Sequence, residues 1–233
     1  MNLDSAKVLV TGGSSGIGRE TARQLAARGA RVAICGRDRA KLARAAEELG
    51  AVAIEADVSR EDQVVRLVST VTERLGGYDV LINNAGFGSF APLTDTTLEE
   101  MQRVFATNVF GAMLVARESA RHFIRQSRGN IVNVASTAAQ RGFAGGTAYA
   151  ASKFALAGMT ECWRAELRKH NVRVMQINPS EVQTEFFAAE GKARPWSDRK
   201  LRAVEIAHAI VSMLEMDDRG FVTEMTVWAT NPD

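Results

Sequence analysis

The sequence contains few residues that bind metals or form disulfides. Only two cysteines and three histidines occur among its 233 residues. Cys35 and Cys162 fall in a predicted strand and a predicted helix, so we expect two buried thiols rather than a disulfide or a catalytic pair. His122, His170 and His208 are scattered without the spacing of metal ligands. The sequence therefore offers no support for a metal site.

Long apolar runs and an excess of one charge are also missing. No stretch of about 18 apolar residues exists, so no membrane-spanning helix is predicted, and the start, MNLDSAKVLVTGG, lacks the layout of a signal peptide. The net charge is +2 and acidic residues are mixed with basic ones, so no nucleic-acid-binding stripe emerges. The composition, 46% hydrophobic and 24% charged, is typical of a soluble globular protein. We expect a cytoplasmic protein.

Short apolar segments that are rich in β-branched residues alternate with helical patterns along the chain. The expected strands are residues 7–12, 31–35, 51–57, 79–86, 129–136, 172–179 and 221–229. Amphipathic stretches separate the first four, at residues 19–29, 39–50 and 60–76. Strands that are apolar throughout suit a parallel sheet covered on both faces, and their alternation with helices indicates right-handed crossovers. We therefore predict an α/β fold with a doubly wound parallel sheet of about seven strands, helices on both faces, and one domain over residues 1–233.

The segments that follow the predicted strands are polar or rich in glycine. Ligands of doubly wound folds bind at the carboxyl ends of the strands, which makes these segments the candidate site. In the first, TGGSSGIGRE, Gly12, Gly16 and Gly18 can form a tight turn, admit a phosphate to the backbone and let a helix pack closely on a strand. The following helix N-terminus offers N–H groups to a pyrophosphate. The alternative is that the glycines serve turn geometry alone, since their spacing differs from G-x-G-x-x-G.

The segment YAASK places Tyr149 and Lys153 one helical turn apart on one face. A free tyrosine has a pKa of about 10 and is a poor base at neutral pH. Because a neighbouring ammonium favours the phenolate, we expect Lys153 to lower the pKa of Tyr149 and make it a usable general acid and base. The alternative is an exposed aromatic side chain with an ordinary i,i+4 neighbour.

Ser136 and Asn108 are the other candidate catalytic residues. Ser136 ends a predicted strand, and its hydroxyl can hold a substrate carbonyl oxygen against the phenol of Tyr149, although a serine there can also be only a turn former. Asn108 lies in the helical pattern LEEMQRVFATNVFGAMLVARESARHFI. An amide among apolar side chains disfavours plain helix, and a surface-facing or kink-forming asparagine is the alternative.

Together, these motifs resemble the short-chain dehydrogenase/reductase family nearly end to end. The shared elements, in the family's order, are Thr11-Gly12-x-x-x-Gly16-x-Gly18, Asp57, Asn83-Asn84-Ala85-Gly86, Asn108, Ser136 and Tyr149-x-x-x-Lys153. The resemblance implies a Rossmann-type fold and hydride transfer between nicotinamide C4 and a carbonyl carbon, with Tyr149 giving or taking the proton of the oxygen. It also implies that Asn108 holds a water that links Lys153 to a proton relay.

The resemblance also implies a set of cofactor contacts along the strand ends. These contacts are Thr11, Gly12, Ser14, Gly16, Ile17, Gly18, Arg37, Asp57, Val58, Asn83, Ala85, Gly86, Tyr149, Lys153, Val182 and Thr184. One departure is Ser180, which stands where the family usually has glycine. If that backbone needs a positive φ, serine would cost on the order of 1 kcal/mol, and the turn that presents Val182 and Thr184 would change.

The end of the second predicted strand indicates NADP(H) rather than NAD(H). NAD-specific sites place an acidic residue there for the ribose hydroxyls, whereas an arginine accommodates the 2′-phosphate. Here Gly36 aligns with the acidic position, Arg37 follows it with two donors for a phosphate, and Ser14 could add a hydroxyl. Asp38 is the counterargument, because it could reach the ribose. It could instead be the N-cap of the next helix, which DRAKLARAAEEL favours.

We expect a small-molecule carbonyl or alcohol substrate under a short lid over about residues 185–200. Phe186, Phe187 and Trp196 would supply apolar cover. The basic residues of this segment are Lys192, Arg194, Arg199 and Lys200. They could attract an acyl carrier, which keeps a 3-oxoacyl-(acyl-carrier-protein) reductase as an alternative function, or they could form only a solvated charged face.

A homo-oligomer, dimer or tetramer, is also expected. The helix opened by YAASKFALAGM carries small residues that permit close approach of a partner helix, as the family resemblance implies, although some of them could face the chain's own sheet. Two other functions stay open: a cofactor-binding regulator that has kept the fold without chemistry, and a partner-binding role for the long helix pair.

Overall fold

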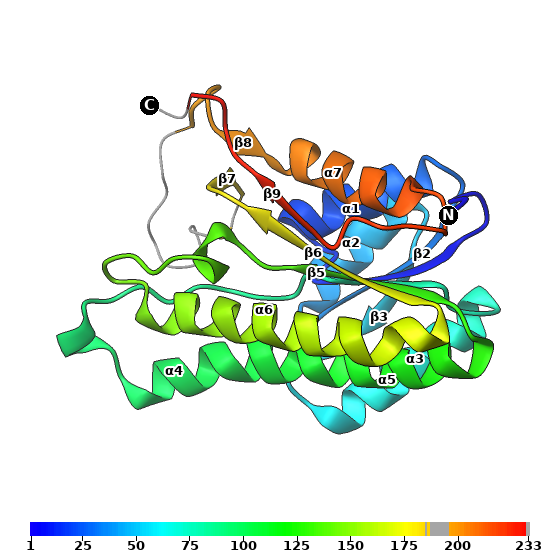
Figure 1. Cartoon of the computed structure of the whole chain (residues 1–233), viewed down its shortest axis with the longest axis horizontal. Helices are drawn as coiled ribbons and strands as arrows, with labels where there is room; N and C mark the ends of the chain where they lie inside the picture. Colours follow the sequence, from blue (N-terminus) through cyan, green and yellow to red (C-terminus); the bar gives the residue numbers. More distant parts are fainter. Residues whose placement is uncertain (185, 187–195, 232–233) are drawn as a thin grey trace.

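The computed structural model describes residues 1–184, 186 and 196–231, and a sheet of seven parallel strands lies at its centre (Figure 1). The strands are β1 (Lys7–Thr11), β2 (Arg31–Gly36), β3 (Val52–Glu55), β4 (Val80–Asn83), β5 (Gly129–Val134), β6 (Val172–Pro179) and β9 (Glu224–Val227). Their order is β3-β2-β1-β4-β5-β6-β9, with every neighbouring pair parallel. The predicted doubly wound sheet is confirmed. Its order reverses between β1 and β4, where such folds bind ligands.

Helices cover both faces of this sheet (Figure 1). One face carries α1 (Gly16–Ala26), α2 (Arg39–Leu49) and α7 (Ala203–Glu215), and the other carries α3 (Glu61–Leu75), α5 (Ala112–Gln126) and α6 (Thr147–Leu167), with α4 (Leu98–Phe105) packed on α6. Short 3₁₀ turns occur at η1 (Leu93–Asp95), η3 (Thr137–Ala139) and η4 (Arg168–His170).

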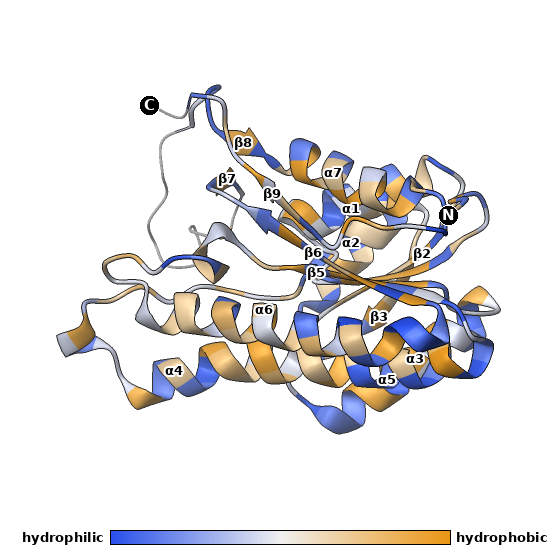
Figure 2. Ribbon diagram, in the orientation of Figure 1, coloured by the Kyte–Doolittle hydropathy of each residue, from blue (hydrophilic) through white to orange (hydrophobic). Residues whose placement is uncertain are grey.

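Each face of the sheet has its own hydrophobic core. Along β1, Val8 and Val10 join the core under α1, α2 and α7, whereas Leu9 joins the core under α3 and α5. Because both faces are buried, the strands are apolar throughout rather than alternating. Figure 2 shows the complementary pattern in α4 and α5, where hydrophobic and hydrophilic residues alternate around the helix.

The helical segment that contains Asn108 is not a plain α-helix. Between α4 and α5 the chain forms a π-helical stretch, η2 (Ala106–Gly111), in which Asn108 is buried. Such stretches are rare and frequently occur at functional sites. The sequence pattern predicted a disturbance of the helix here, and the structure confirms it, with Asn108 turned inward rather than toward solvent.

A second, smaller pairing lies beyond β6. The strand β7 (Val182–Gln183) pairs in parallel with β8 (Leu201–Arg202). Gln183 Nε2 donates to the Ser197 carbonyl at 2.6 Å, and Ser197 N donates to Gln183 Oε1 at 2.7 Å. These contacts join β7 to the residues that precede β8.

Both cysteines are free thiols. Cys35 is buried in β2 as expected, whereas Cys162 is exposed. The prediction for Cys162 was wrong because it lies on the outward side of α6. Within residues 1–184, 186 and 196–231, no helix has the length and apolar character needed to cross a bilayer.

Candidate active site

An open cavity of about 1230 Å³ lies at the carboxyl ends of β1, β4, β5 and β6. A second cavity, of about 450 Å³, continues from it toward the ends of β2 and β3. The two cavities have Gly12, Ser14, Ala85, Gly86 and Phe87 in common. They therefore form one elongated groove across the point where the strand order reverses, the place and shape that suit a dinucleotide.

Most of the residues predicted from the sequence line this groove. In the larger cavity they are Gly12, Ser14, Gly16, Ile17, Ala85, Gly86, Ser136, Tyr149, Lys153, Val182 and Thr184. Those found in the smaller cavity alone are Arg37, Asp57 and Val58. Thr11, Gly18, Asn83 and Asn108 line neither cavity.

The glycine loop has the geometry of a phosphate-binding turn. Gly12 and Gly16 have φ values of +64° and +52°, a conformation that residues with a side chain rarely adopt. A Cβ on Gly18 would lie 2.4 Å from the Gly12 carbonyl oxygen. The loop and α1 can therefore pack closely against each other only because residue 18 has no side chain. The side chain of Ser15, at the N-cap of α1, makes no capping hydrogen bond. The N–H groups of the first turn thus remain available to an anion.

Thr11 and Asn83 line neither cavity, and their side chains bind neighbouring backbone. Thr11 Oγ1 accepts hydrogen bonds from the backbone N–H groups of Asn84, at 2.9 Å, and Ala85, at 3.0 Å. Asn83 Nδ2 donates to the Ala112 carbonyl at 2.9 Å. The two residues fix the segment after β4. Gly18 allows α1 to pack closely against Gly12 and Asn84.

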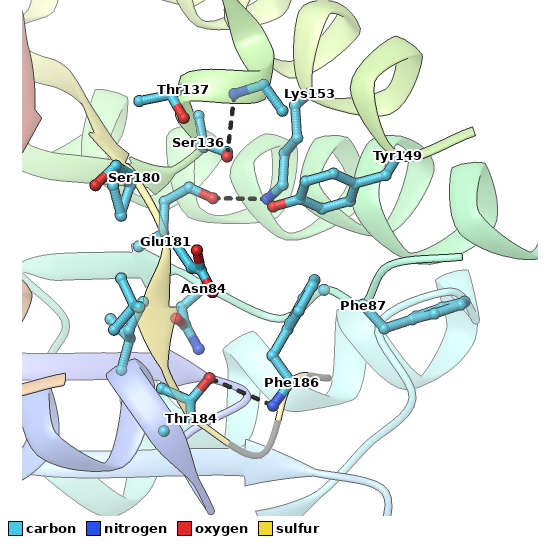
Figure 3. A pocket seen from close by; sticks show the side chains of 18 of the residues that line it. Asn84, Phe87, Ser136, Thr137, Tyr149, Lys153, Ser180, Glu181, Thr184 and Phe186 are labelled. Atoms are coloured by element: carbon cyan, nitrogen blue, oxygen red, sulfur yellow. Dashed lines mark hydrogen bonds between the residues drawn. The ribbon is translucent and has the colours of Figure 1, made fainter. Parts of the chain in front are cut away.

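Tyr149 and Lys153 point into the larger cavity from the first turns of α6 (Figure 3). Burial raises the pKa of Tyr149 to about 12, although the neighbouring Ser136 hydroxyl lowers it in part. Burial also lowers the pKa of Lys153 from 10.5 to about 8. In a poorly hydrated site the charged form of each group is disfavoured. At neutral pH the phenol is therefore neutral and the amine is protonated.

The pKa of Tyr149 is raised rather than lowered as expected from the neighbouring Lys153, because burial dominates. Lys153 Nζ donates to the Val134 carbonyl at 2.9 Å and lies 5.7 Å from the centroid of the Tyr149 ring (Figure 3). The ammonium therefore faces the ring and a backbone carbonyl, and the effect of burial on the phenol outweighs its charge.

Ser136 stands at the end of β5 with its hydroxyl beside the phenol of Tyr149. Its Oγ accepts a hydrogen bond from Ala138 N at 3.1 Å, which fixes the side-chain direction (Figure 3). Two hydroxyl groups from different elements thus converge in one wall of the cavity. A carbonyl oxygen between them could accept from both.

Asn108 ties the π-helical stretch to the segment after β4 and to α6. Its Oδ1 accepts from Phe87 N at 3.1 Å, and its Nδ2 donates to the Phe87 carbonyl at 2.9 Å and to Ser152 Oγ at 3.1 Å. A Cβ on Gly86 would lie 3.0 Å from Asn108 Oδ1 and 3.8 Å from Lys153 Nζ. Gly86 therefore lies between the Asn108 amide and the Lys153 ammonium.

The one carboxylate directly after β2, that of Asp38, lines the smaller cavity but is engaged in capping the next helix. Asp38 is the N-cap of α2, and its Oδ1 accepts from Lys41 N at 2.9 Å, which confirms the capping interpretation. Arg37 is exposed and lines the smaller cavity. A Cβ on Gly36 would lie 3.5 Å from Ser14 Oγ, so the Ser14 hydroxyl borders the same position.

Ser180 does not require the left-handed backbone that favours glycine. It is absent from the non-glycine residues with positive φ in the described parts of the chain, so the expected strain does not arise. Val182 and Thr184 accordingly reach the cavity wall. Of the predicted lid, Phe186 packs edge-on against Tyr149 with ring centroids 5.6 Å apart. Trp196 is 65% exposed and lines neither of the two cavities. Phe187 and most of the predicted lid lie outside the described residues.

Several lining residues were missed by the sequence argument. The larger cavity also contains Lys41, Phe90, Arg141, Phe143, Glu181 and Trp228. Their positions in the sequence carry no spacing signal, although Glu181 lies next to a predicted strand end. Asn84, which belongs to the Asn83-Asn84-Ala85-Gly86 motif, lines this cavity too.

Comparison with known proteins agrees with this geometry. The short chain dehydrogenase family matches residues 6–195. The oxidoreductase YxnA of Bacillus subtilis (strain 168) is 36% identical over 77% of this chain, which spans about half, 52%, of that relative. An oxidoreductase of Staphylococcus aureus (strain USA300) is 31% identical over 94% of this chain and 95% of its own. The 3-oxoacyl-[acyl-carrier-protein] reductase of Bos taurus is 36% identical, covering 76% of each chain.

Solved structures superpose closely on the chain. A serine dehydrogenase complexed with NADP+ has a TM-score of 0.89 at 25% identity and covers 94% of this chain and 93% of its own. A short chain dehydrogenase/reductase from Burkholderia phymatum, in complex with NAD, has a TM-score of 0.87 at 27% identity and covers 96% and 90%.

The fold, the groove and the family match define an oxidoreductase of the Rossmann type. The chain belongs to the short-chain dehydrogenase/reductase family. Enzymes of this family use NAD(P)(H) and act on small-molecule substrates.

Proposed function

We propose that the protein is an NADP(H)-dependent oxidoreductase that interconverts a carbonyl and a secondary or primary alcohol, with Tyr149 as the general acid and base. The observation that carries this proposal is the meeting of the Ser136 and Tyr149 hydroxyls, with the Lys153 ammonium, in the same cavity as the glycine loop. The cofactor would supply or accept the hydride at its nicotinamide ring.

The residues of the chain would handle the substrate oxygen and its proton. Because the neutral phenol is the stable form up to a pH of about 12, Tyr149 is set to donate a proton to a carbonyl oxygen, the direction of reduction. Ser136 would hold that oxygen against the phenol. For alcohol oxidation Tyr149 must first lose its proton, and the Lys153 ammonium would support the resulting phenolate. Asn108 would fix the position of α6, which carries Lys153, relative to the segment after β4 through its bonds to Ser152 and Phe87.

The groove fits a dinucleotide, and its residues support NADP(H). The left-handed Gly12 and Gly16 and the uncapped N-terminus of α1 form a cradle for a pyrophosphate. Asp57 and Val58 would border the adenine, and Val182 and Thr184 the carboxamide. At the end of β2, Gly36 stands where an NAD-specific site has a carboxylate, and the exposed Arg37 that follows it could bind a 2′-phosphate.

An acyl-carrier thioester substrate is the alternative within the same chemistry. It is supported by the 36% identity to the reductase of Bos taurus that acts on such thioesters. Of the basic residues on which it depends, Lys192 and Arg194 lie outside the described residues, and Lys200 is bound to Glu181 at 2.9 Å.

We also propose a cytoplasmic homo-oligomer built from one domain per chain, without a nucleic-acid or membrane partner. On α6, Phe154 is 46% exposed and a Cβ on Gly158 would meet nothing within 4 Å, whereas Ala150 is buried in its own chain. Phe110, on the adjoining π-helical stretch, is 55% exposed. These residues leave an apolar helical surface that a second copy could cover.

Turnover of NADPH with a panel of ketones, aldehydes and 3-oxoacyl thioesters tests the proposed function. Tyr149→Phe should abolish turnover while cofactor binding stays largely intact, and Lys153→Ala should lose both. Because the groups act in one relay, the double variant should be scarcely worse than either single one. Tyr78→Phe, at the only other tyrosine of the chain, is the matched control and should keep its turnover. Near-normal turnover in Tyr149→Phe would refute the assignment of Tyr149 as the general acid and base. Absence of turnover in the wild-type protein with every compound would favour the cofactor-binding regulator instead.

A further inference from the structure

Arg141 and Trp228 form the rim of the larger cavity on the side of β9. Arg141 follows η3, Trp228 follows β9, and the guanidinium carbon lies 4.9 Å from the centroid of the indole ring. The preceding residue, Gln140, anchors this segment to β9, because its Nε2 donates to Glu224 Oε1 at 2.9 Å and to Thr226 Oγ1 at 3.2 Å. The stacking on Trp228 and the bonds of Gln140 to β9 therefore hold the Arg141 guanidinium at the rim.

The positive charge of Arg141 is not balanced by a carboxylate. Within the described residues, its side chain has no ion pair or hydrogen bond, only the stacking on Trp228. Glu181 is the one acidic side chain among the described residues of this wall, and Lys200 binds it at 2.9 Å. The other ionised groups in the wall, Lys41 and Lys153, are cations. A guanidinium stacked by its face still presents N–H donors at its edge. The described residues of the cavity wall carry a net positive charge.

Aromatic rings line the space next to the phenol of Tyr149. Phe90 and Phe186 meet the Tyr149 ring edge-on, with centroids at 5.4 Å and 5.6 Å, and Phe143 lies 6.0 Å from Phe90. Such walls favour a flat apolar body over a polyol, because hydroxyl groups placed against the rings would lose their hydrogen bonds to water.

We propose that Arg141 is a specificity-determining residue that forms an anion subsite at the rim of the cavity. The preferred substrates are then aromatic carbonyl compounds that carry a carboxylate away from the reacting carbonyl. The ring lies among the phenylalanines, the carbonyl oxygen meets Ser136 and Tyr149, and the carboxylate meets Arg141. This assignment of a substrate class rests on the proposed function and narrows it.

Matched acids and esters test the subsite. The substrates are 4-acetylbenzoate and 3-(4-acetylphenyl)propanoate, two acids of different reach, each compared with its methyl ester. Arg141→Gln should raise the KM of the better acid about ten-fold, as the loss of a hydrogen bond between charged groups at a solvated site predicts, and leave the esters and kcat nearly unchanged. Arg141→Lys should retain part of the preference. Arg168→Gln, the same change at an exposed arginine beyond the far end of α6, should have no effect.

The preference of the wild-type protein for the acid should also weaken as salt is added, since the subsite is partly exposed. Equal KM values for acid and ester in the wild-type protein, or an equal change for both in Arg141→Gln, would overturn the subsite while turnover of the esters still supports the oxidoreductase.

A binding measurement separates the two proposals if no ketone is reduced. Titration calorimetry compares 4-methylbenzoate with its methyl ester, on wild-type protein and on Arg141→Gln, with NADP+ present. Binding of the acid that depends on Arg141 would support the subsite although the proposed chemistry had failed. Absence of such binding would overturn the subsite as well.

Discussion

Replacing Lys153 by methionine should stabilise the folded protein while it abolishes turnover. The lysine is only 5% exposed, and burial lowers its pKa from 10.5 to about 8. At about 1.4 kcal/mol for each pKa unit, this difference of about 2.5 corresponds to about 3 kcal/mol against the buried ammonium. Methionine fills a similar space without charge. It leaves the Val134 carbonyl without the lysine donor, at a cost of about 1 kcal/mol, so a net gain of about 2 kcal/mol is expected at pH 7.

The advantage of the methionine variant should shrink as the pH rises. Below a pH of about 8, Lys153 is protonated in both the folded and the unfolded chain, and the full penalty is present. Between about 8 and 10.5 the unfolded chain keeps a proton that the folded chain has lost, so the stability of the wild-type protein increases with pH. Methionine has no proton to lose. The difference between the two proteins should therefore fall by about 2 kcal/mol between pH 7 and pH 10.

Urea unfolding of both proteins at pH 7 and pH 10 measures this difference. Other titrating groups, such as Tyr149, are common to both proteins, so their contributions largely cancel. Lys169→Met, at an exposed lysine of η4, is the control and should change stability little at either pH. A Lys153→Met protein that is less stable than the wild type at pH 7, or a difference that is the same at both pH values, would refute the reasoning.

Three further predictions concern the cofactor, the glycine loop and the assembly. Arg37→Ala should raise the KM for NADPH by one or two orders of magnitude, given about 1.5–3 kcal/mol for a hydrogen bond between charged groups, and change that for NADH little; a wild-type preference for NADH in kcat/KM would contradict this. Gly18→Ala should lower stability by about 1–3 kcal/mol and weaken cofactor binding, because the added Cβ meets the Gly12 carbonyl and Asn84. Its control, Gly158→Ala, adds a Cβ in open space and should bind the cofactor normally. Light scattering at micromolar concentration should show an oligomer, and a monomer alone would speak against the proposed apolar interface.

The residue pattern was enough to predict the sheet and the position of the groove. Strands and helices produce hydrophobic patterns among residues that are a few positions apart in the sequence. Because both faces of this sheet are buried, its strands are apolar throughout, and that pattern can be recognised in the sequence. The capping role of Asp38 and the disturbance of the helix at Asn108 were predictable for the same reason, because each is decided within one or two turns.

The electrostatics and the substrate end of the site depend on the packing of segments that are remote in the sequence. The pKa of Tyr149 depends on how much water the whole assembly excludes, and the bond from Lys153 to Val134 reaches across elements, so the i,i+4 spacing predicted the wrong direction. Likewise, Arg141 meets Trp228 because β6 pairs with both β5 and β9, which brings two remote segments together. Such contacts leave no period in the sequence, because they depend on the three-dimensional packing of strands rather than on local spacing.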